Sequence, residues 1–352
     1  MRAASASPLE PIELAIPTKK PSLLWSYTTV LFVTNRKENE GDDDQFFTNI
    51  SDNKIYLGEA CVSYPTKRQP AEQDLDEGDL EAPAKFFTVK GYLPLDSPRD
   101  FKLALYNQLD PLFERNCPNE NSGVEPIPTL FIHGWRASFT SGITRGAQLK
   151  LDLDRKSVIV LSWPADQEGI QSYSGAEKEE GKATAIVQYV MELIKHSTND
   201  YPSVIAHSMG ARLYADGVNL LDQNEHSFVT RSTATILAAP DVDFAQFQKR
   251  FGVFKLRNEY TTVYCGIDIA LSLSWLYHGG RRLGFCSDGE IKPTAPEEMV
   301  LVTGRFRDTW RHSYFLSAPE MIDDMKSVIF KDERRLNPLE SLEVPSRKLD
   351  LR

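Results

Sequence analysis

From Pro128 onward, the chain alternates short apolar runs with segments long enough to form helices. Six runs have the length and the β-branched content of buried strands. They are Thr129–Ile132, Ser157–Leu161, Ser203–Ala206, Thr235–Ala238, Thr261–Cys265 and Met299–Val302. Strands separated by helices pair in parallel, because each helix carries the chain back across a face of the sheet. The sequence therefore predicts an α/β fold, with a mostly parallel central sheet flanked by helices on both faces.

Two further strand signals precede Pro128. The apolar runs Thr28–Thr34 and Glu59–Tyr64 are expected to add strands to the same sheet. The acidic stretch Gln69–Glu81 that follows them is expected to be a solvated loop. The chain thus divides into an N-terminal arm, a part that extends the sheet, an α/β core that is expected to carry the chemistry, and a polar C-terminal tail. These parts are residues 1–27, 28–127, 128–330 and 331–352.

The amino-acid composition limits the kinds of molecule that this protein is expected to bind. The chain has 40 lysines and arginines against 50 aspartates and glutamates, a formal net charge of −10, so we expect no nucleic-acid partner. No stretch approaches the roughly 18 apolar residues of a spanning helix, and the N-terminus lacks the apolar run of a secretory signal. We therefore predict a cytoplasmic protein without stable membrane insertion. The four cysteines are widely spaced, which indicates neither a zinc site nor a disulfide framework.

The sharpest turn predicted in the core lies at Ser208, between a strand and a helical stretch. A strand-to-helix elbow needs small residues two positions before and after its serine, and Ala206 and Gly210 stand there. Glycine is usual at the first of these positions, but a methyl group still permits the turn. An elbow of this kind presents its serine as a nucleophile, and the N–H of Met209 is then a predicted oxyanion donor. The alternative is that Ser208 only caps the helix.

A nucleophilic serine needs a histidine to remove its proton. Only His226, His278 and His312 follow Ser208 in the chain. His226 lies in a polar stretch and is expected at the surface. His312 follows the last predicted strand, where hydrolases with the chain order serine, acid, histidine carry their base. We therefore predict His312 as the general base, with His278 as the second choice.

The base in turn needs a carboxylate to orient it, and two aspartates follow strands beyond the serine. Asp268 follows the second of these strands, the more common position for the acid, and Asp241 follows the first. Both ends belong to the edge of the sheet where ligand sites of open α/β proteins gather. We favour Asp268 as the acid and keep Asp241 as the alternative.

The loop after the strand Thr129–Ile132 is expected to complete the site. It begins with His133, Gly134 and Trp135, and the N–H of Trp135 is the second predicted oxyanion donor. His133 itself is expected to be structural. His207 and Phe139 are predicted to contact the substrate. Trp135 can line the same pocket, and either Trp135 or Phe139 can belong to the core instead.

Seven segments together resemble one branch of the α/β-hydrolase superfamily, the bacterial serine hydrolase-like proteins grouped as domain of unknown function 900. The segments are Phe32–Arg36, Phe131–Trp135, Leu161–Pro164, Ala206–Gly210, Ala238–Asp241, Tyr264–Ser272 and His312–Tyr314. The resemblance implies the α/β-hydrolase fold, alanine at position 206, and Ser208, Asp268 and His312 as a catalytic triad. It implies no substrate, because the fold serves many chemistries.

The sequence thus favours a serine hydrolase that cleaves small carboxylic esters through an acyl-enzyme. Neither a metal nor an organic cofactor is expected, since this chemistry requires none and no phosphate-binding glycine loop is present. Two alternatives remain: a non-catalytic binding or scaffold protein of the same fold, and a lipase or thioesterase that uses Asp241 as its acid. The oligomeric state stays open.

Overall fold

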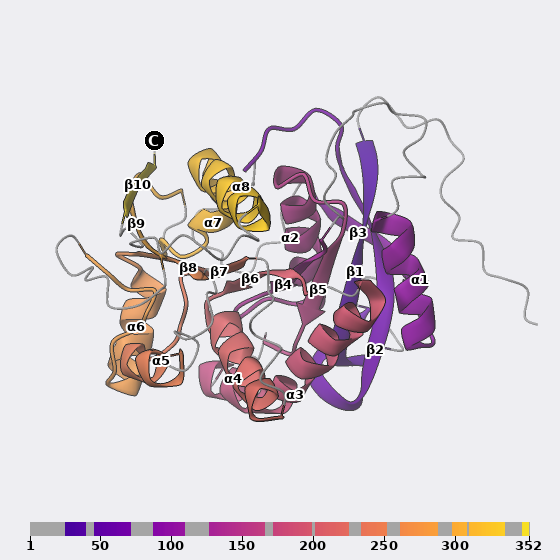
Figure 1. The fold of residues 1–352 in the computed structure, drawn as a ribbon, viewed down its shortest axis with the longest axis horizontal. Coiled ribbons are helices and arrows are strands. Elements are labelled where there is room, and N and C mark those ends of the chain that lie inside the picture. Colours follow the sequence, from indigo (N-terminus) through magenta and orange to yellow (C-terminus); the bar gives the residue numbers. More distant parts are fainter. Residues whose placement is uncertain are drawn as a thin grey trace, which may run out of the picture.

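One mixed sheet forms the centre of the molecule (Figure 1). The computed structural model describes residues 25–39, 46–71, 87–109, 127–165, 172–198, 201–224, 234–251, 261–287, 298–307, 310–334 and 347–351. The strands within these ranges are β1 (Trp25–Glu38), β2 (Phe47–Pro65), β3 (Thr88–Pro94), β4 (Thr129–Ile132), β5 (Val158–Ser162), β6 (Ser203–His207), β7 (Thr235–Ala238), β8 (Thr261–Gly266), β9 (Glu298–Gly304) and β10 (Arg347–Leu351).

The strands lie in the order β10-β9-β8-β7-β6-β4-β5-β1-β2-β3. All neighbours from β10 to β1 pair in parallel, and only β2 runs antiparallel to its neighbours β1 and β3. The carboxyl ends of β4, β6, β7, β8 and β9 therefore meet at one edge of the sheet. Loops at that edge are the expected place for a ligand site.

Helices cover both faces of the sheet. They are α1 (Pro98–Leu109), α2 (Phe139–Asp152), α3 (Ser172–Thr198), α4 (Met209–Asn224), α5 (Phe244–Phe251), α6 (Ile269–His278), α7 (Tyr314–Ser317) and α8 (Pro319–Arg334). Figure 1 shows α2, α7 and α8 above the sheet and α3, α4, α5 and α6 below it. The predicted three-layer α/β arrangement is confirmed.

The strands separate two hydrophobic layers because successive side chains point to opposite faces. In β5, Ile159 and Leu161 pack with α3 and α4, whereas Val158 and Val160 pack with α2 and α8. All four side chains are fully buried. A strand covered on both faces reads as a continuous apolar run, which is why these strands were recognisable from the sequence.

Some boundaries differ from those predicted. The segment expected to be an N-terminal arm contributes Trp25 to Tyr27 to β1, and the segment expected to be a polar tail contributes β10. The edge strand β10 pairs with β9 and buries Leu351 on the sheet. A five-residue strand with three charged residues carries little sequence signal. From position 72 onward, the predicted acidic loop lies outside the described residues.

A disulfide joins Cys265 at the end of β8 to Cys286, so the expectation that the cysteines form no disulfide is wrong for this pair. The two residues are 21 positions apart in the sequence. The segment between them contains α6 and returns to the end of β8, so the two cysteines lie side by side. Gly266 N donates to Gly284 O at 3.0 Å, and Cys286 N donates to Gly266 O at 3.1 Å. Cysteine spacing alone does not reveal such a return.

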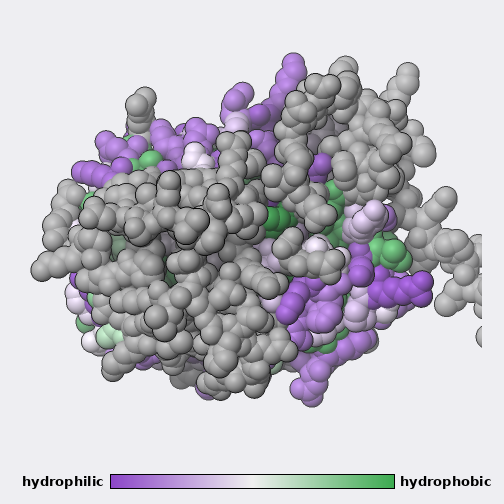
Figure 2. All heavy atoms as spheres, in the orientation of Figure 1, coloured by the Kyte–Doolittle hydropathy of each residue, from purple (hydrophilic) through white to green (hydrophobic). Residues whose placement is uncertain are grey.

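On the face shown in Figure 2, the coloured side chains are mainly hydrophilic, with smaller apolar areas between them. In the part of the chain that the structure describes, no helix has the length and apolar character needed to cross a membrane.

We predict that the double substitution Cys265→Ser with Cys286→Ser lowers the free energy of unfolding by about 3 kcal/mol. The disulfide closes a loop of this length and so restricts the unfolded chain. Chemical denaturation under non-reducing conditions measures the change, and Cys61→Ser is the control, because Cys61 is a free thiol in β2. An unchanged denaturation midpoint in the double variant would contradict this role.

Candidate active site

Ser208 stands at the apex of a strained turn between β6 and α4. Its φ of 54° lies in the left-handed region, which costs a residue with a side chain of the order of 1–3 kcal/mol. The turn is held by the neighbouring strand: Ser208 N donates to Ala238 O at 3.0 Å, and Asp241 N donates to Ser208 O at 3.0 Å. The elbow geometry expected from the sequence is therefore present, with the serine at its tip.

Two glycines allow the chain to pack tightly around this turn. A Cβ atom added at Gly210 would lie 2.6 Å from the carbonyl oxygen of Ile132 and closer still to that of His133. A Cβ atom added at Gly134 would lie 2.8 Å from the Cβ of Ser208. The loop after β4 therefore lies directly against the serine, as an oxyanion-hole loop must.

Asp268 and His312 form a buried hydrogen-bonded pair. The Asp268 carboxylate is fully buried, and its Oδ2 lies 2.6 Å from His312 Nδ1. Its Oδ1 accepts a hydrogen bond of 2.9 Å from Leu271 N, so the same carboxylate caps the start of α6. Because both oxygens are engaged, the carboxylate is fixed in position, and the Nδ1 edge of the imidazole is fixed with it.

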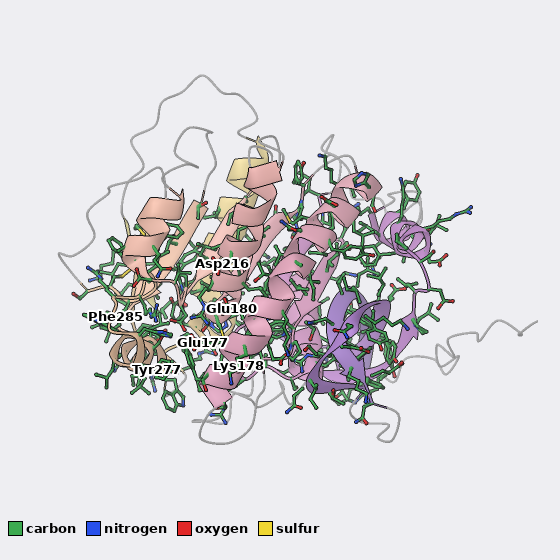
Figure 3. All side chains as sticks on the ribbon, turned by 90° about the horizontal axis from the view of Figure 1, so that it is seen from below. Glu177, Lys178, Glu180, Asp216, Tyr277 and Phe285 are labelled. Atoms are coloured by element: carbon green, nitrogen blue, oxygen red, sulfur yellow. A yellow bond between two sulfur atoms is a disulfide. The ribbon has the colours of Figure 1, made fainter. Side chains whose placement is uncertain are left out.

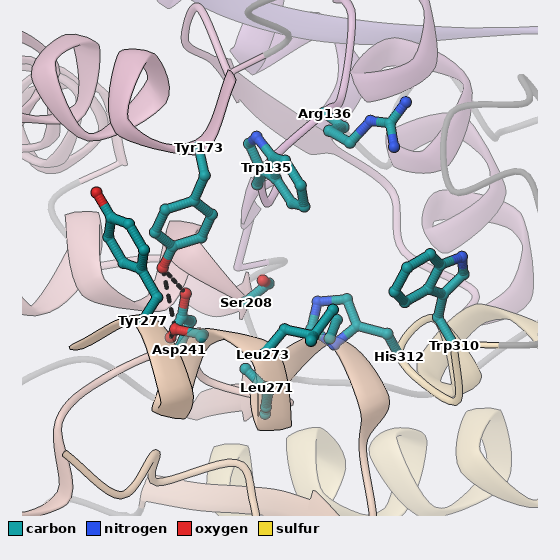
Figure 4. Close-up of a pocket in the computed structure, with 12 residues that line it drawn as sticks. Trp135, Arg136, Tyr173, Ser208, Asp241, Leu271, Leu273, Tyr277, Trp310 and His312 are labelled. Carbon is teal, nitrogen blue, oxygen red and sulfur yellow. Dashed lines mark hydrogen bonds between the residues drawn. The ribbon is translucent and has the colours of Figure 1, made fainter. Parts of the chain in front are cut away.

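Ser208 and His312 line one pocket of about 250 Å³ at the carboxyl edge of the sheet. Figure 4 shows the His312 ring turned toward the Ser208 hydroxyl. The other lining side chains are mainly apolar or aromatic, including Trp135, Leu271, Leu273, Tyr277 and Trp310. A serine, a histidine and an apolar wall thus share one cavity, which suits a small neutral ligand with an apolar part.

Asp241 also lines the pocket, but its carboxylate is engaged elsewhere. Oδ1 accepts from Ser274 Oγ at 2.6 Å and lies 3.2 Å from Arg282 Nε, while Oδ2 accepts from the Tyr173 hydroxyl. Figure 4 shows Asp241 and its partner Tyr173 on the side of the pocket away from His312. The structure therefore brings Asp268, and not Asp241, to the imidazole of His312.

The two predicted substrate contacts, His207 and Phe139, do not lie in the pocket lining. Phe139 packs in an aromatic cluster with Phe32 and Phe47, at ring centroid distances of 5.0 and 4.6 Å. His207, the last residue of β6, lies against α7 and not in the pocket. Its ring stacks on Phe315, and its Nε2 lies 3.1 Å from His312 O.

His207 therefore supports the backbone of His312. Burial, assisted by the charges of His312 and Arg145, holds the pKa of His207 well below its ordinary value. The ring is neutral, and with a proton on Nε2 it donates to the carbonyl of His312.

The remaining histidines of the predicted site have structural partners. Nε2 of His278, the second choice for the base, lies 3.2 Å from both the Tyr173 hydroxyl and a Glu177 carboxylate oxygen. His133 is fully buried, and burial together with the charge of Arg36 lowers its pKa to about 3. His226 lies outside the described residues.

Arg36 was not recognised from the sequence as part of the site. Its guanidinium is fully buried and donates to carbonyl oxygens at both ends of the site: Ala137 O at 2.7 Å and Trp163 O at 2.6 Å. It also donates to Ser162 Oγ at 3.1 Å. Arg36 thus links β1 to the loops after β4 and β5. Its only sequence signal is its place in the segment Phe32–Arg36, directly after an apolar strand.

Fold and site together define an α/β hydrolase, with a serine elbow and a histidine–carboxylate pair at the carboxyl edge of a mostly parallel sheet. Residues 125–329 match the model of a family described as alpha/beta hydrolase of unknown function (DUF900), and the chain belongs to this family. No curated protein matches the chain.

Solved esterases show weak similarity to this chain. One is EstE1, a thermophilic and thermostable carboxylesterase cloned from a metagenomic library, with 14% identity over 67% of this chain and 71% of that chain, and a TM-score of 0.27. Another is an esterase from Pyrobaculum calidifontis, with 10% identity over 66% of this chain and 69% of that chain, and a TM-score of 0.29. The fold assignment rests on the sheet and the family match.

We predict that Gly210→Ala destabilises the protein, because its methyl group would collide with two backbone carbonyl oxygens that cannot move independently of β4. A loss of about 2 kcal/mol or more is expected in thermal or chemical unfolding. Gly181→Ala in α3 is the matched control, since no atom lies within 4 Å of its added Cβ. That substitution should stabilise the helix slightly. Equal effects of the two substitutions would contradict the packing described for the elbow.

Proposed function

We propose that this protein hydrolyses carboxylic esters through an acyl-enzyme on Ser208. His312 takes the proton of the hydroxyl as Ser208 Oγ attacks the ester carbonyl, and then gives it to the departing alcohol. Asp268 holds the imidazole and stabilises its charged form. Water next attacks the acyl group, with His312 again as the base, and the carboxylic acid leaves.

The backbone N–H groups of Met209 and Trp135 are proposed to hold the oxyanion. Met209 begins α4, so its N–H belongs to the positive end of the helix dipole. Trp135 is next to Gly134, which lies against Ser208. Within the described part of the chain, neither N–H donates a hydrogen bond to the protein, which leaves both free for a ligand.

The observation that carries the proposal is the 2.6 Å contact between His312 Nδ1 and Asp268 Oδ2, beside the pocket that Ser208 shares with His312. A purely structural histidine would not need the partners that His312 has, which are a fully buried carboxylate at one ring nitrogen and a serine hydroxyl that faces the ring. This pairing also favours Asp268 over Asp241 as the acid.

The alternatives of a scaffold protein and of a site based on Asp241 are less well supported. A binding protein has no need for a strained serine, which would be replaced at no cost to folding. An acid at Asp241 would first have to give up its contacts to Tyr173, Ser274 and Arg282.

The disulfide bears on the compartment. The sequence favoured a cytoplasmic protein, but the bond between Cys265 and Cys286 favours an oxidising compartment, because cytosolic thiols are kept reduced. Determining the redox state of Cys265 and Cys286 in protein taken from its native cells would decide between the two.

We predict that Ser208→Ala lowers ester hydrolysis by at least about 10⁴-fold and abolishes labelling by a fluorophosphonate, because the nucleophile is lost. Turnover of a p-nitrophenyl ester and labelling of the purified protein measure the two effects. Ser274→Ala is the matched control, since Ser274 lines the same pocket, and its labelling should persist. Labelling that survives in Ser208→Ala would contradict the assignment of the nucleophile.

We also predict different effects for the two aspartates. Asp268→Asn should lower kcat by about 10³-fold or more, because an amide no longer stabilises the charged imidazole. Asp241→Asn should lower kcat far less, since Asp241 contacts Tyr173, Ser274 and Arg282 rather than the base. Steady-state kinetics on one soluble ester compares them, and the reverse ranking would make Asp241 the acid.

A further inference from the structure

The outer face of α6 is apolar where a surface helix normally carries charge. Ile269, Leu273, Leu276 and Tyr277 recur at spacings of four, three and one residues, which places them on one side of the helix. Their side chains are 42%, 53%, 83% and 61% exposed. The opposite side, with Leu271 and Ser274, is buried. The helix therefore has an apolar side toward the protein and a second apolar side toward the outside.

We propose that this outer face of α6 docks on an uncharged lipid surface and that the substrates are esters presented by that surface. The docking itself does not depend on the proposed function, whereas the substrate class rests on it. The contact is peripheral and differs from the stable membrane insertion that the sequence does not predict.

The docking face is continuous with the pocket. Leu273 and Tyr277 belong both to the exposed face and to the pocket lining, beside Ser208 and His312. Figure 4 shows Leu273 and Tyr277 on the α6 side of the pocket, with Trp135 across from them. An acyl chain that leaves a lipid surface at α6 can therefore contact Leu273 and Tyr277 as it enters the pocket that contains the serine.

The charge of the protein indicates which kind of lipid surface the outer face of α6 would bind. The segment Ile269–His278 contains no aspartate, glutamate, lysine or arginine, and the whole chain has a formal net charge of −10. Docking on anionic lipids would be opposed by this charge, because anionic membranes attract basic segments. An apolar face on an acidic protein matches a neutral surface, such as a zwitterionic membrane or a droplet of neutral ester.

The helix is anchored firmly enough to present such a face. Its first turn is capped by Asp268, and the disulfide between Cys265 and Cys286 closes the excursion that contains it. Its last turn lies against the start of α3, where His278 is 3.2 Å from Glu177. Figure 3 shows Tyr277 and Glu177 on this side of the molecule. Because Asp268 caps α6 and also contacts His312, movement of α6 would disturb Asp268. The outer face of α6 is therefore held in a fixed position.

A lipid surface fits this face better than a second protein does. Any protein seated on Leu273 and Tyr277 would lie over the mouth of the pocket and block it. A surface made of the substrate, or carrying it, can cover the same residues and supply the pocket at the same time. Isolated apolar residues at a surface need no explanation, but a contiguous set at the mouth of a site indicates binding.

The test uses Leu276→Glu, because Leu276 is the most exposed residue of the face and does not line the pocket. Leu103→Glu in α1 is the control, with the same change at an exposed leucine of a helix elsewhere; Leu103 is 53% exposed, against 83% for Leu276. Co-sedimentation with phosphatidylcholine vesicles measures docking. The wild type and Leu103→Glu should bind, and Leu276→Glu should bind at least about tenfold more weakly. Leu276→Ser is a second variant that adds no charge.

Hydrolysis of emulsified triolein and of dissolved p-nitrophenyl acetate then tests the substrate class. Leu276→Glu should lose at least about tenfold on the emulsion and keep the wild-type rate on the dissolved ester. Wild-type protein that does not sediment with vesicles, or dimerises through this face in analytical ultracentrifugation, would overturn the docking proposal. Vesicle binding without any ester hydrolysis would instead leave docking supported and overturn both the proposed function and the substrate class.

Discussion

The carboxylate of Asp268 joins the chemistry of the site to the architecture around it. It has no contact with solvent, and its two oxygens serve two different partners: the imidazole of His312 and the first turn of α6. A buried carboxylate is stable only when such partners compensate for its lost hydration. The position of the His312 imidazole and the start of α6 therefore both depend on one side chain that follows β8.

The serine depends on a different constraint, which is the close approach of backbones. Ser208 keeps its left-handed conformation because the end of β7 holds its N–H and the loop after β7 holds its carbonyl group, and because Gly210 and Gly134 leave no side chain in the way. Strain of this kind persists only where the surroundings fix it. Arg36 adds to the same rigidity by tying the neighbouring loops to β1 through their carbonyl oxygens. These groups hold the serine turn and the loops beside it in place at the carboxyl edge of the sheet.

Local sequence signals predicted the core of this fold well, and long-range contacts limited the rest. The apolar runs gave the central strands, and the order of Ser208, Asp268 and His312 along the chain agrees with their meeting at one edge of the sheet. The sequence could not show that Phe139 belongs to the core, because an aromatic residue near a site has the same sequence pattern whether its side chain faces the core or the cavity. The Cys265–Cys286 disulfide and the contacts of Arg36 join residues whose proximity is set only by the folded chain. The strand β10 was missed because its few apolar residues alternate with charged ones.

The central claim is that Ser208 carries an acyl group during turnover. Acid quenching of the wild-type protein within its first turnovers of a p-nitrophenyl ester, followed by mass spectrometry of the intact protein and its peptides, tests this directly. The account predicts a mass increase equal to one acyl group, located on the peptide that contains Ser208. Ester hydrolysis without any acylated protein, or an acyl group on a different residue, would contradict it.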